Sequence, residues 1–199
     1  MTGLIKNSNI VSFGCSNTYG QGLEDCYINN GPGPHPSNQA WPAVLAREYN
    51  CSLDNKSIPG ASNLQILDKI LNHSFNNSDL VITMWATPDR DYIFPNQQLG
   101  VWQDNPIIKH WLSTHTEHDL IHRSWLYIHH ASLYLTQKQI PFYNFYSYSK
   151  GFPENKPNLN IPIRDINVSK RDYALDKLHM GPSSHVNTAM AIKKVINEN

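Results

Sequence analysis

The sequence has no excess of charge of either sign and no long apolar run. Its 199 residues include 16 basic and 16 acidic side chains, and the basic residues form no cluster. Because nucleic acids and anionic membranes attract concentrated positive charge, we expect neither as a partner. The longest apolar run, residues 80–85, is far too short to cross a bilayer.

A secretory signal and a metal-binding pattern of cysteines are also missing. Residues 1–9 are polar and lead straight into the first apolar run, without the basic and apolar regions of a signal peptide. The three cysteines, Cys15, Cys26 and Cys51, lack metal-ligand spacing. We therefore expect free thiols and a cytoplasmic location.

Short β-rich runs alternate along the chain with longer segments of helical periodicity. The predicted strands are residues 9–13, 51–55, 80–85 and 140–145, and the predicted helices are residues 41–49, 62–73, 117–138 and 183–196. This alternation is typical of a parallel sheet with helices on both faces. We predict a single three-layer α/β/α domain over residues 1–199, flavodoxin-like, with a central and mainly parallel sheet of five strands. Residues 150–170 are interpreted as a polar surface loop.

Two connecting segments are long for this architecture. Residues 20–40 follow the first strand, and an insertion near residues 86–116 follows the third. Loops of this length in compact domains are usually functional or disordered. The insertion is rich in aromatic residues, which suit the wall of a ligand site or, equally, a small satellite core. Its candidate substrate-binding residues are Tyr92, Trp102 and Trp111.

Two polar motifs have the composition of a nucleophile and its base. Gly14 and Ser16 directly follow the first strand, where the carboxyl ends of parallel strands form a ligand-binding rim. Asp176 and His179 lie three residues apart, just before the last predicted helix. A serine nucleophile needs a histidine within hydrogen-bond reach and a carboxylate that orients it. Each motif alone is common and usually structural, because the first resembles a turn and the second a helix cap.

Taken together and in this order, the motifs resemble the SGNH (GDSL-like) hydrolase family. Residues 14–18, Gly-Cys-Ser-Asn-Thr, are similar to the family's Gly-Asp-Ser-x-Thr block, with cysteine in place of aspartate. Residues 55–63 resemble the second block, in which Gly60 matches a glycine whose backbone N–H binds the oxyanion. Asp176 and His179 match the last block, and His185 falls at a structural position at the start of the closing helix.

The resemblance implies a serine esterase that needs no metal and no organic cofactor. Ser16 would attack the ester carbonyl, His179 would take its proton, and Asp176 would orient His179. The backbone N–H groups of Ser16 and Gly60 would stabilise the oxyanion. After the third strand the family has Gly-x-Asn-Asp, whereas residues 85–90 contain no asparagine, and Thr87 is the candidate replacement donor. Loss of one oxyanion donor typically costs about a hundredfold or more in rate.

Three other interpretations stay open. A catalytically weak or inactive relative that binds a glycan is the alternative function, because the aromatic insertion would serve either version. His118 and His122 share one helix face and His115 falls near it, but no carboxylate completes a zinc pattern, so histidines without metal are favoured. Cys15 as the nucleophile is disfavoured, because neighbouring side chains point apart.

The sequence does not define the acyl group of the substrate or the oligomeric state. The expected substrate is a small-molecule or glycan ester, and the tryptophans and tyrosines of the loops favour an O-acetylated carbohydrate. The Gly-Cys-Ser block followed by a Trp-Pro-x-x-Leu helix, residues 41–45 here, is similar to some short viral and bacterial members of the family. That similarity points to a viral or bacterial relative.

Overall fold

The computed structural model describes residues 8–93, 97–100, 106–146, 163–166 and 172–198. Within them, five strands form one sheet in the order β4-β1-β5-β8-β9, and every neighbouring pair is parallel. The predicted flavodoxin-like sheet is therefore confirmed. Its strands are β1 (Asn9–Gly14), β4 (Ser52–Asn55), β5 (Asp79–Trp85), β8 (Phe142–Tyr146) and β9 (Ile163–Asp165).

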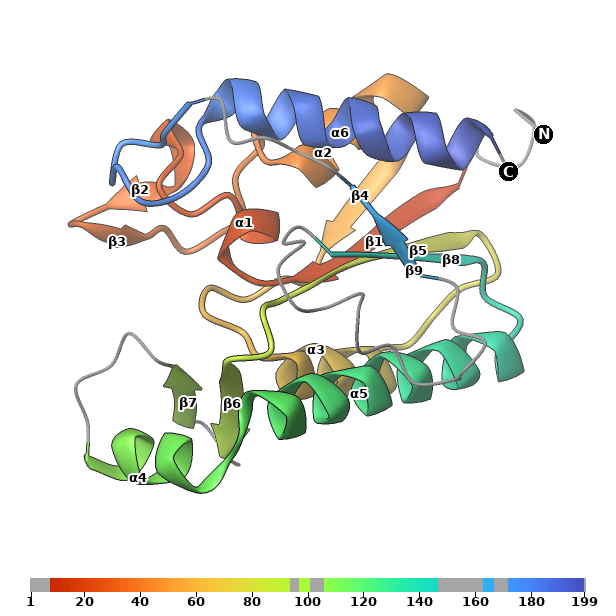
Figure 1. Cartoon of the computed structure of the whole chain (residues 1–199). Helices are drawn as coiled ribbons and strands as arrows, with labels where there is room; N and C mark the ends of the chain where they lie inside the picture. The colour runs from red at the N-terminus through yellow and green to blue at the C-terminus, as the bar shows by residue number, and fades with distance from the viewer. Residues whose placement is uncertain (1–7, 94–96, 101–105, 147–162, 167–171, 199) are drawn as a thin grey trace.

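Helices cover both faces of this sheet (Figure 1). Helices α2 (Trp41–Tyr49) and α6 (Pro182–Asn197) pack together on one face, and α3 (Asn63–Leu71) and α5 (Glu117–Gln137) pack together on the other. All four were predicted from apolar periodicity. Along α5, for example, Ile121, Trp125 and Ile128 recur every three or four residues and are fully buried against the sheet.

Two polar contacts fix the start of α6. Asp172 accepts the backbone N–H groups of Ser183 and Ser184, each at 2.8 Å, and so caps the first turn from outside the helix. Burial alone would raise the pKa of Asp172, but hydrogen bonds from these two serines outweigh burial and lower it. His185 Nδ1 accepts the backbone N–H of Trp41 at 3.1 Å, and burial lowers the pKa of His185 to about 4. His185 is thus an interior residue that joins α6 to α2.

One prediction is wrong. Residues 150–170 were interpreted as a surface loop, but Ile163–Asp165 pairs in parallel with β8 and forms the edge strand β9. A strand of three residues with a central arginine has no alternation long enough to be recognised. The remainder of that stretch, apart from Ile166, lies outside the described residues.

Both long connections contain regular structure. The first follows the single-turn helix α1 (Ser16–Tyr19) and contains the 3-10 turn η1 (Glu24–Cys26) and a hairpin of β2 (Tyr27–Ile28) and β3 (Gly31–Pro32). The insertion contains a hairpin of β6 (Arg90–Ile93) and β7 (Gln97–Gly100), followed by α4 (Pro106–Thr114). In the described part of the chain, no helix has the length and apolar character needed to cross a bilayer.

Candidate active site

Ser16 lies at the point where the sheet order reverses direction. β1 has β4 on one side and β5 on the other, and ligands of such sheets bind beyond the carboxyl ends of the strands at this position. β1 ends at Gly14, and Ser16 is the first residue of the single-turn helix α1. Gly20, in the left-handed conformation with φ +82°, ends that helix by donating its N–H to the Ser16 carbonyl. The nucleophile candidate therefore stands on the rim, as predicted.

Cys15, its neighbour, has a different environment. The side chain is buried in the same apolar cluster as Phe13, Ala61 and Ala86, on the α3 and α5 side of the sheet. The Cys15 side chain thus contributes to this core, and the choice of Ser16 over Cys15 as the nucleophile stays a prediction.

Asp176 and His179 form a close pair on the loop before α6. His179 Nδ1 lies 2.6 Å from Asp176 Oδ2, while Asp176 Oδ1 accepts the backbone N–H groups of Leu178 at 2.9 Å and His179 at 3.0 Å. Burial would raise the pKa of Asp176, but these hydrogen bonds and the nearby imidazole lower it. An ionised carboxylate only accepts hydrogen bonds, so the proton of a neutral His179 resides on Nδ1. Nε2 is then free to act as a base.

A narrow hairpin holds this pair in place. Tyr173 and Met180 form an antiparallel bridge, and the Ala174 N–H donates to the His179 carbonyl at 3.1 Å. The side chains of Asp176 and His179 are 11% and 21% exposed, so both are largely shielded from solvent, and the imidazole less so than the carboxylate.

The hairpin packs against the segment that follows α1. The Leu175 N–H donates to the Gly22 carbonyl at 2.9 Å. A Cβ added at Gly22 would lie 2.5 Å from Asp176 Oδ2, so only glycine allows this approach. In Figure 1 the blue segment before α6 accordingly lies beside the red and orange segments after β1. Within the described residues, Ser16 and His179 are not joined by a hydrogen bond, and catalytic hydrogen bonds of ligand-free enzymes are often long.

The loop between β4 and α3 runs alongside the end of β1. The Ile58 N–H donates to the Gly14 carbonyl at 3.1 Å, and Asn55 Nδ2 donates to the Thr18 carbonyl at 3.0 Å. Gly60 follows on this loop with φ +75°, a conformation that favours glycine. These contacts bring the segment that carries Gly60 beside the segment that carries Ser16.

Thr87 lies in the loop after β5, where the family's asparagine is missing. Ala86, directly before it, is bound on both its N–H and its carbonyl by the side chain of Asn63. Asp89 and Arg90, which follow, form a loose ion pair with 3.9 Å between nitrogen and oxygen. No role was predicted for Asn63 or Gly22. The signals available were an asparagine at the end of the block over residues 55–63 and at the start of a predicted helix, and the pattern Gly20-Gln-Gly22.

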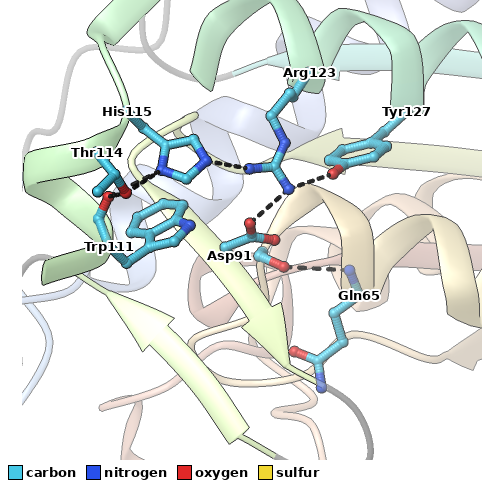
Figure 2. Close-up of polar contacts among 8 residues, drawn as sticks. Gln65, Asp91, Trp111, Thr114, His115, Arg123 and Tyr127 are labelled. Carbon is cyan, nitrogen blue, oxygen red and sulfur yellow. Dashed lines mark hydrogen bonds and ion pairs between the residues drawn. The ribbon is translucent and has the colours of Figure 1, made fainter. Parts of the chain in front are cut away.

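The structure describes the three aromatic candidates for substrate binding to different extents. Tyr92 lies on β6, where its backbone pairs with Gln98, and its side chain and Trp102 lie outside the described residues. Trp111 is half-buried on α4, with its ring centre 5.1 Å from that of His115 (Figure 2). Trp111 thus belongs at least to the internal packing of the insertion, while its contact with a ligand stays a prediction.

The histidine-rich region makes contacts that are not those of a metal site. His118 and His122 stack with ring centres 6.4 Å apart on the exposed face of α5. His115 instead contacts Arg123 through Nε2 and the Trp111 carbonyl through Nδ1 (Figure 2). Over the described ranges, no three histidine, cysteine or acidic side chains gather closely enough to hold a metal ion.

Comparison with known proteins identifies the fold. No protein-family model and no curated protein matches the sequence significantly. Among solved structures, a protein described as lipolytic and of the G-D-S-L family, from Desulfitobacterium hafniense, matches over 95% of this chain and 99% of its own, with a TM-score of 0.61 and 13% identity. The chain has the SGNH (GDSL-like) hydrolase fold. The predicted resemblance is confirmed at this level.

Carbohydrate esterases share this SGNH fold. A carbohydrate acetylesterase family member from Sinorhizobium meliloti matches over 96% of this chain and 98% of its own, with a TM-score of 0.57 and 13% identity. A carbohydrate esterase whose active site is described as having divergent catalytic and non-catalytic binding functions matches over 96% of this chain and 65% of its own, with a TM-score of 0.60 and 10% identity. At such identities the matches show the SGNH fold alone.

Proposed function

We propose that this chain is a serine esterase with Ser16 as nucleophile, His179 as general base and Asp176 as the carboxylate that orients His179. The observation that carries the proposal is the 2.6 Å contact between His179 Nδ1 and Asp176 Oδ2, on a hairpin that packs against Gly22, six residues after Ser16. A carboxylate in that position fixes the imidazole tautomer and stabilises the imidazolium formed during the reaction. The esterases among the structures with the same fold support this assignment.

The reaction follows from these positions. Ser16 Oγ attacks the ester carbonyl carbon while its proton passes to His179 Nε2. The backbone N–H groups of Ser16 and Gly60, together with the Thr87 hydroxyl, donate hydrogen bonds to the oxyanion. The tetrahedral intermediate collapses, and the alcohol leaves with the proton from His179. Water then attacks the acyl-enzyme, with His179 again as the base, and releases the acid.

We infer that the substrate is an acyl ester of a small molecule or a glycan. The acetylesterases among the structural neighbours support a short acyl group on a sugar. Tyr92, Trp102 and Trp111 of the insertion are consistent with a sugar as the alcohol part of the ester, because aromatic rings stack on the apolar faces of sugars.

A non-catalytic glycan-binding protein is the second candidate. It is favoured by the absence of asparagine between residues 85 and 90 and by the neighbour whose active site has non-catalytic binding functions. On this alternative, the same rim would bind an acylated sugar and leave it intact.

The deciding experiment measures hydrolysis of para-nitrophenyl acetate, O-acetylated xylan and an O-acetylated sialoside. Wild type is compared with Ser16→Ala, His179→Ala and the control His130→Ala, whose imidazole is exposed on α5. We expect the first two variants to lose about a thousandfold or more in kcat while the control keeps wild-type activity. Wild type that is no faster than Ser16→Ala, but still binds the acetylated oligosaccharide by calorimetry, would favour the binding protein.

A further inference from the structure

We propose that Asn63 is a positioning residue that fixes the two oxyanion-binding loops relative to each other, a role that rests on the proposed esterase function. Asn63 is the first residue of α3, three residues after Gly60, and its side chain is bound to Ala86, directly before Thr87. Asn63 therefore connects the segment that carries Gly60 to the segment that carries Thr87.

The side chain of Asn63 is buried, and both its oxygen and its nitrogen make hydrogen bonds. Its Oδ1 accepts the Ala86 N–H at 2.8 Å, while Nδ2 donates to the Ala86 carbonyl at 3.0 Å and to Ser124 Oγ at 3.1 Å. The residue is 1% exposed. Because a backbone N–H only donates and a carbonyl only accepts, the reciprocal pair with Ala86 admits one orientation of the amide. No other uncharged side chain of this length presents an acceptor and two donors in one plane.

Asp91, on β6 just beyond this loop, is held by Arg123, the residue before Ser124 on α5. Arg123 Nη2 lies 2.8 Å from Asp91 Oδ2 and 3.2 Å from the Tyr127 hydroxyl, and Nη1 lies 3.1 Å from His115 Nε2 (Figure 2). Ser124 binds Asn63, and Arg123 binds Asp91. Ala86, through Asn63, and Asp91, directly, are thus both tied to neighbouring residues of α5.

This arrangement matters because the donors of the oxyanion site come from separate loops. Catalytic groups must be held within about 0.5 Å of the productive geometry, and a misplacement of about 1 Å can cost on the order of a hundredfold in rate. In the loop after β5, Thr87 is the candidate donor in place of the family's asparagine, so the position of its hydroxyl depends on how firmly the loop backbone is held. Asn63, at the start of α3, holds that backbone at Ala86.

The test compares Asn63→Ala with a matched control, Asn144→Ala. Asn144 is also 1% exposed, and its side chain also bridges two elements, accepting from Trp85 Nε1 at 3.0 Å and donating to Ser132 Oγ at 2.9 Å. Both variants should lose similar stability. With para-nitrophenyl acetate, we expect Asn63→Ala to lose about tenfold or more in kcat with KM changed by less than about twofold, whereas Asn144→Ala keeps kcat within about twofold. Hydrogen–deuterium exchange of residues 86–91 should speed up only in Asn63→Ala.

Each outcome decides the matter. An active wild type with an equally active Asn63→Ala overturns this inference alone, and an equal loss of kcat in Asn144→Ala reduces the effect to general stability and overturns it as well. Wild type that is no faster than Ser16→Ala overturns the esterase and the positioning role together. If Asn63→Ala does not fold, Asn63→Ser takes its place, because serine presents one shorter hydroxyl instead of the separate acceptor and donor that bind Ala86. A kcat unchanged in that folded variant, with unchanged exchange at residues 86–91, then overturns the inference.

Discussion

Gly22 tests whether the hairpin that carries the base depends on its contact with the segment after Ser16. It has φ +86°, and a Cβ there would lie 2.5, 2.6 and 2.8 Å from Oδ2, Cγ and Oδ1 of Asp176. Gly22→Ala therefore strains the backbone and pushes the whole carboxylate of Asp176 away from its position beside His179.

The two effects have separate magnitudes. An alanine in the left-handed region costs about 1–2 kcal/mol, which lowers Tm by about 2–8 °C in a chain of this size. Displacing a carboxylate whose contact with the imidazole is 2.6 Å long should cost much more in activity, about a hundredfold in kcat, because the shift needed to relieve the overlap is about 1 Å. We thus expect a large loss of rate in a protein that stays folded at 25 °C.

The assay is hydrolysis of para-nitrophenyl acetate beside thermal unfolding monitored by circular dichroism. Gly31→Ala is the matched control, because its new Cβ would have no close neighbour nearer than 3.7 Å and its φ is not positive. A double-mutant cycle with Asp176→Asn shows whether the loss of kcat passes through Asp176. If it does, adding Gly22→Ala to Asp176→Asn should lower kcat only slightly further. Gly22→Ala with wild-type kcat, or an undiminished additional loss in the Asp176→Asn background, would refute the reasoning.

Three further predictions concern stability. Asp172→Ala should destabilise the protein by about 1–2 kcal/mol at pH 7 in urea unfolding, because it removes the cap of α6. Since the pKa of Asp172 is lowered on folding, its contribution is present above the pKa of an unfolded aspartate and is lost as the pH falls through the lower folded value. The difference in stability between variant and wild type should therefore shrink as the pH falls below the unfolded value. The pKa of His185 falls from 6.5 to about 4 on folding, so between these pH values the unfolded chain binds a proton that the folded chain does not. The free energy of unfolding should therefore drop by on the order of 3 kcal/mol from pH 7 to pH 4. His185→Gln should remove this part of the pH dependence. Arg123→Ala removes the cation beside buried Asp91 and should lower the free energy of unfolding by about 1–3 kcal/mol. Lys56→Ala breaks an exposed ion pair and should lower it by less than about 1 kcal/mol. Equal losses in the two variants would contradict the argument that burial makes the Arg123 contact more important.

The sequence was informative where a pattern is local. The helix over residues 41–49 was predicted with its observed bounds, because apolar side chains at helical spacing must face a core. The pair of Asp176 and His179 was expected from a spacing of three residues, and their contact at 2.6 Å needs no distant partner. β9 was missed because its three residues contain no repeat, and only its pairing with β8 makes them a strand.

Contacts between distant residues escaped prediction for the same physical reason. Asn63 bonds to residues 23 and 61 positions away, and the block over residues 55–63 in which it lies gives no sign of these partners. Gly22 is required by Asp176, which approaches it only once the sheet has formed. The need for asparagine and glycine at these two positions becomes visible only from their neighbours in the fold.

The hairpin with Asp176 and His179 also sets the order in which function can arise. It follows all five strands of the sheet in the chain, yet it is anchored to the segment just after the first one, through the hydrogen bond from the Leu175 N–H to the Gly22 carbonyl. The helix that follows it, α6, is joined to α2 by the contact of His185 with Trp41, which spans 144 residues. Contacts of such separation form late, because the chain between their ends must first be ordered. On the proposed function, Ser16 and His179 would come together only once this hairpin has docked. The appearance of esterase activity during refolding should then mark that final docking.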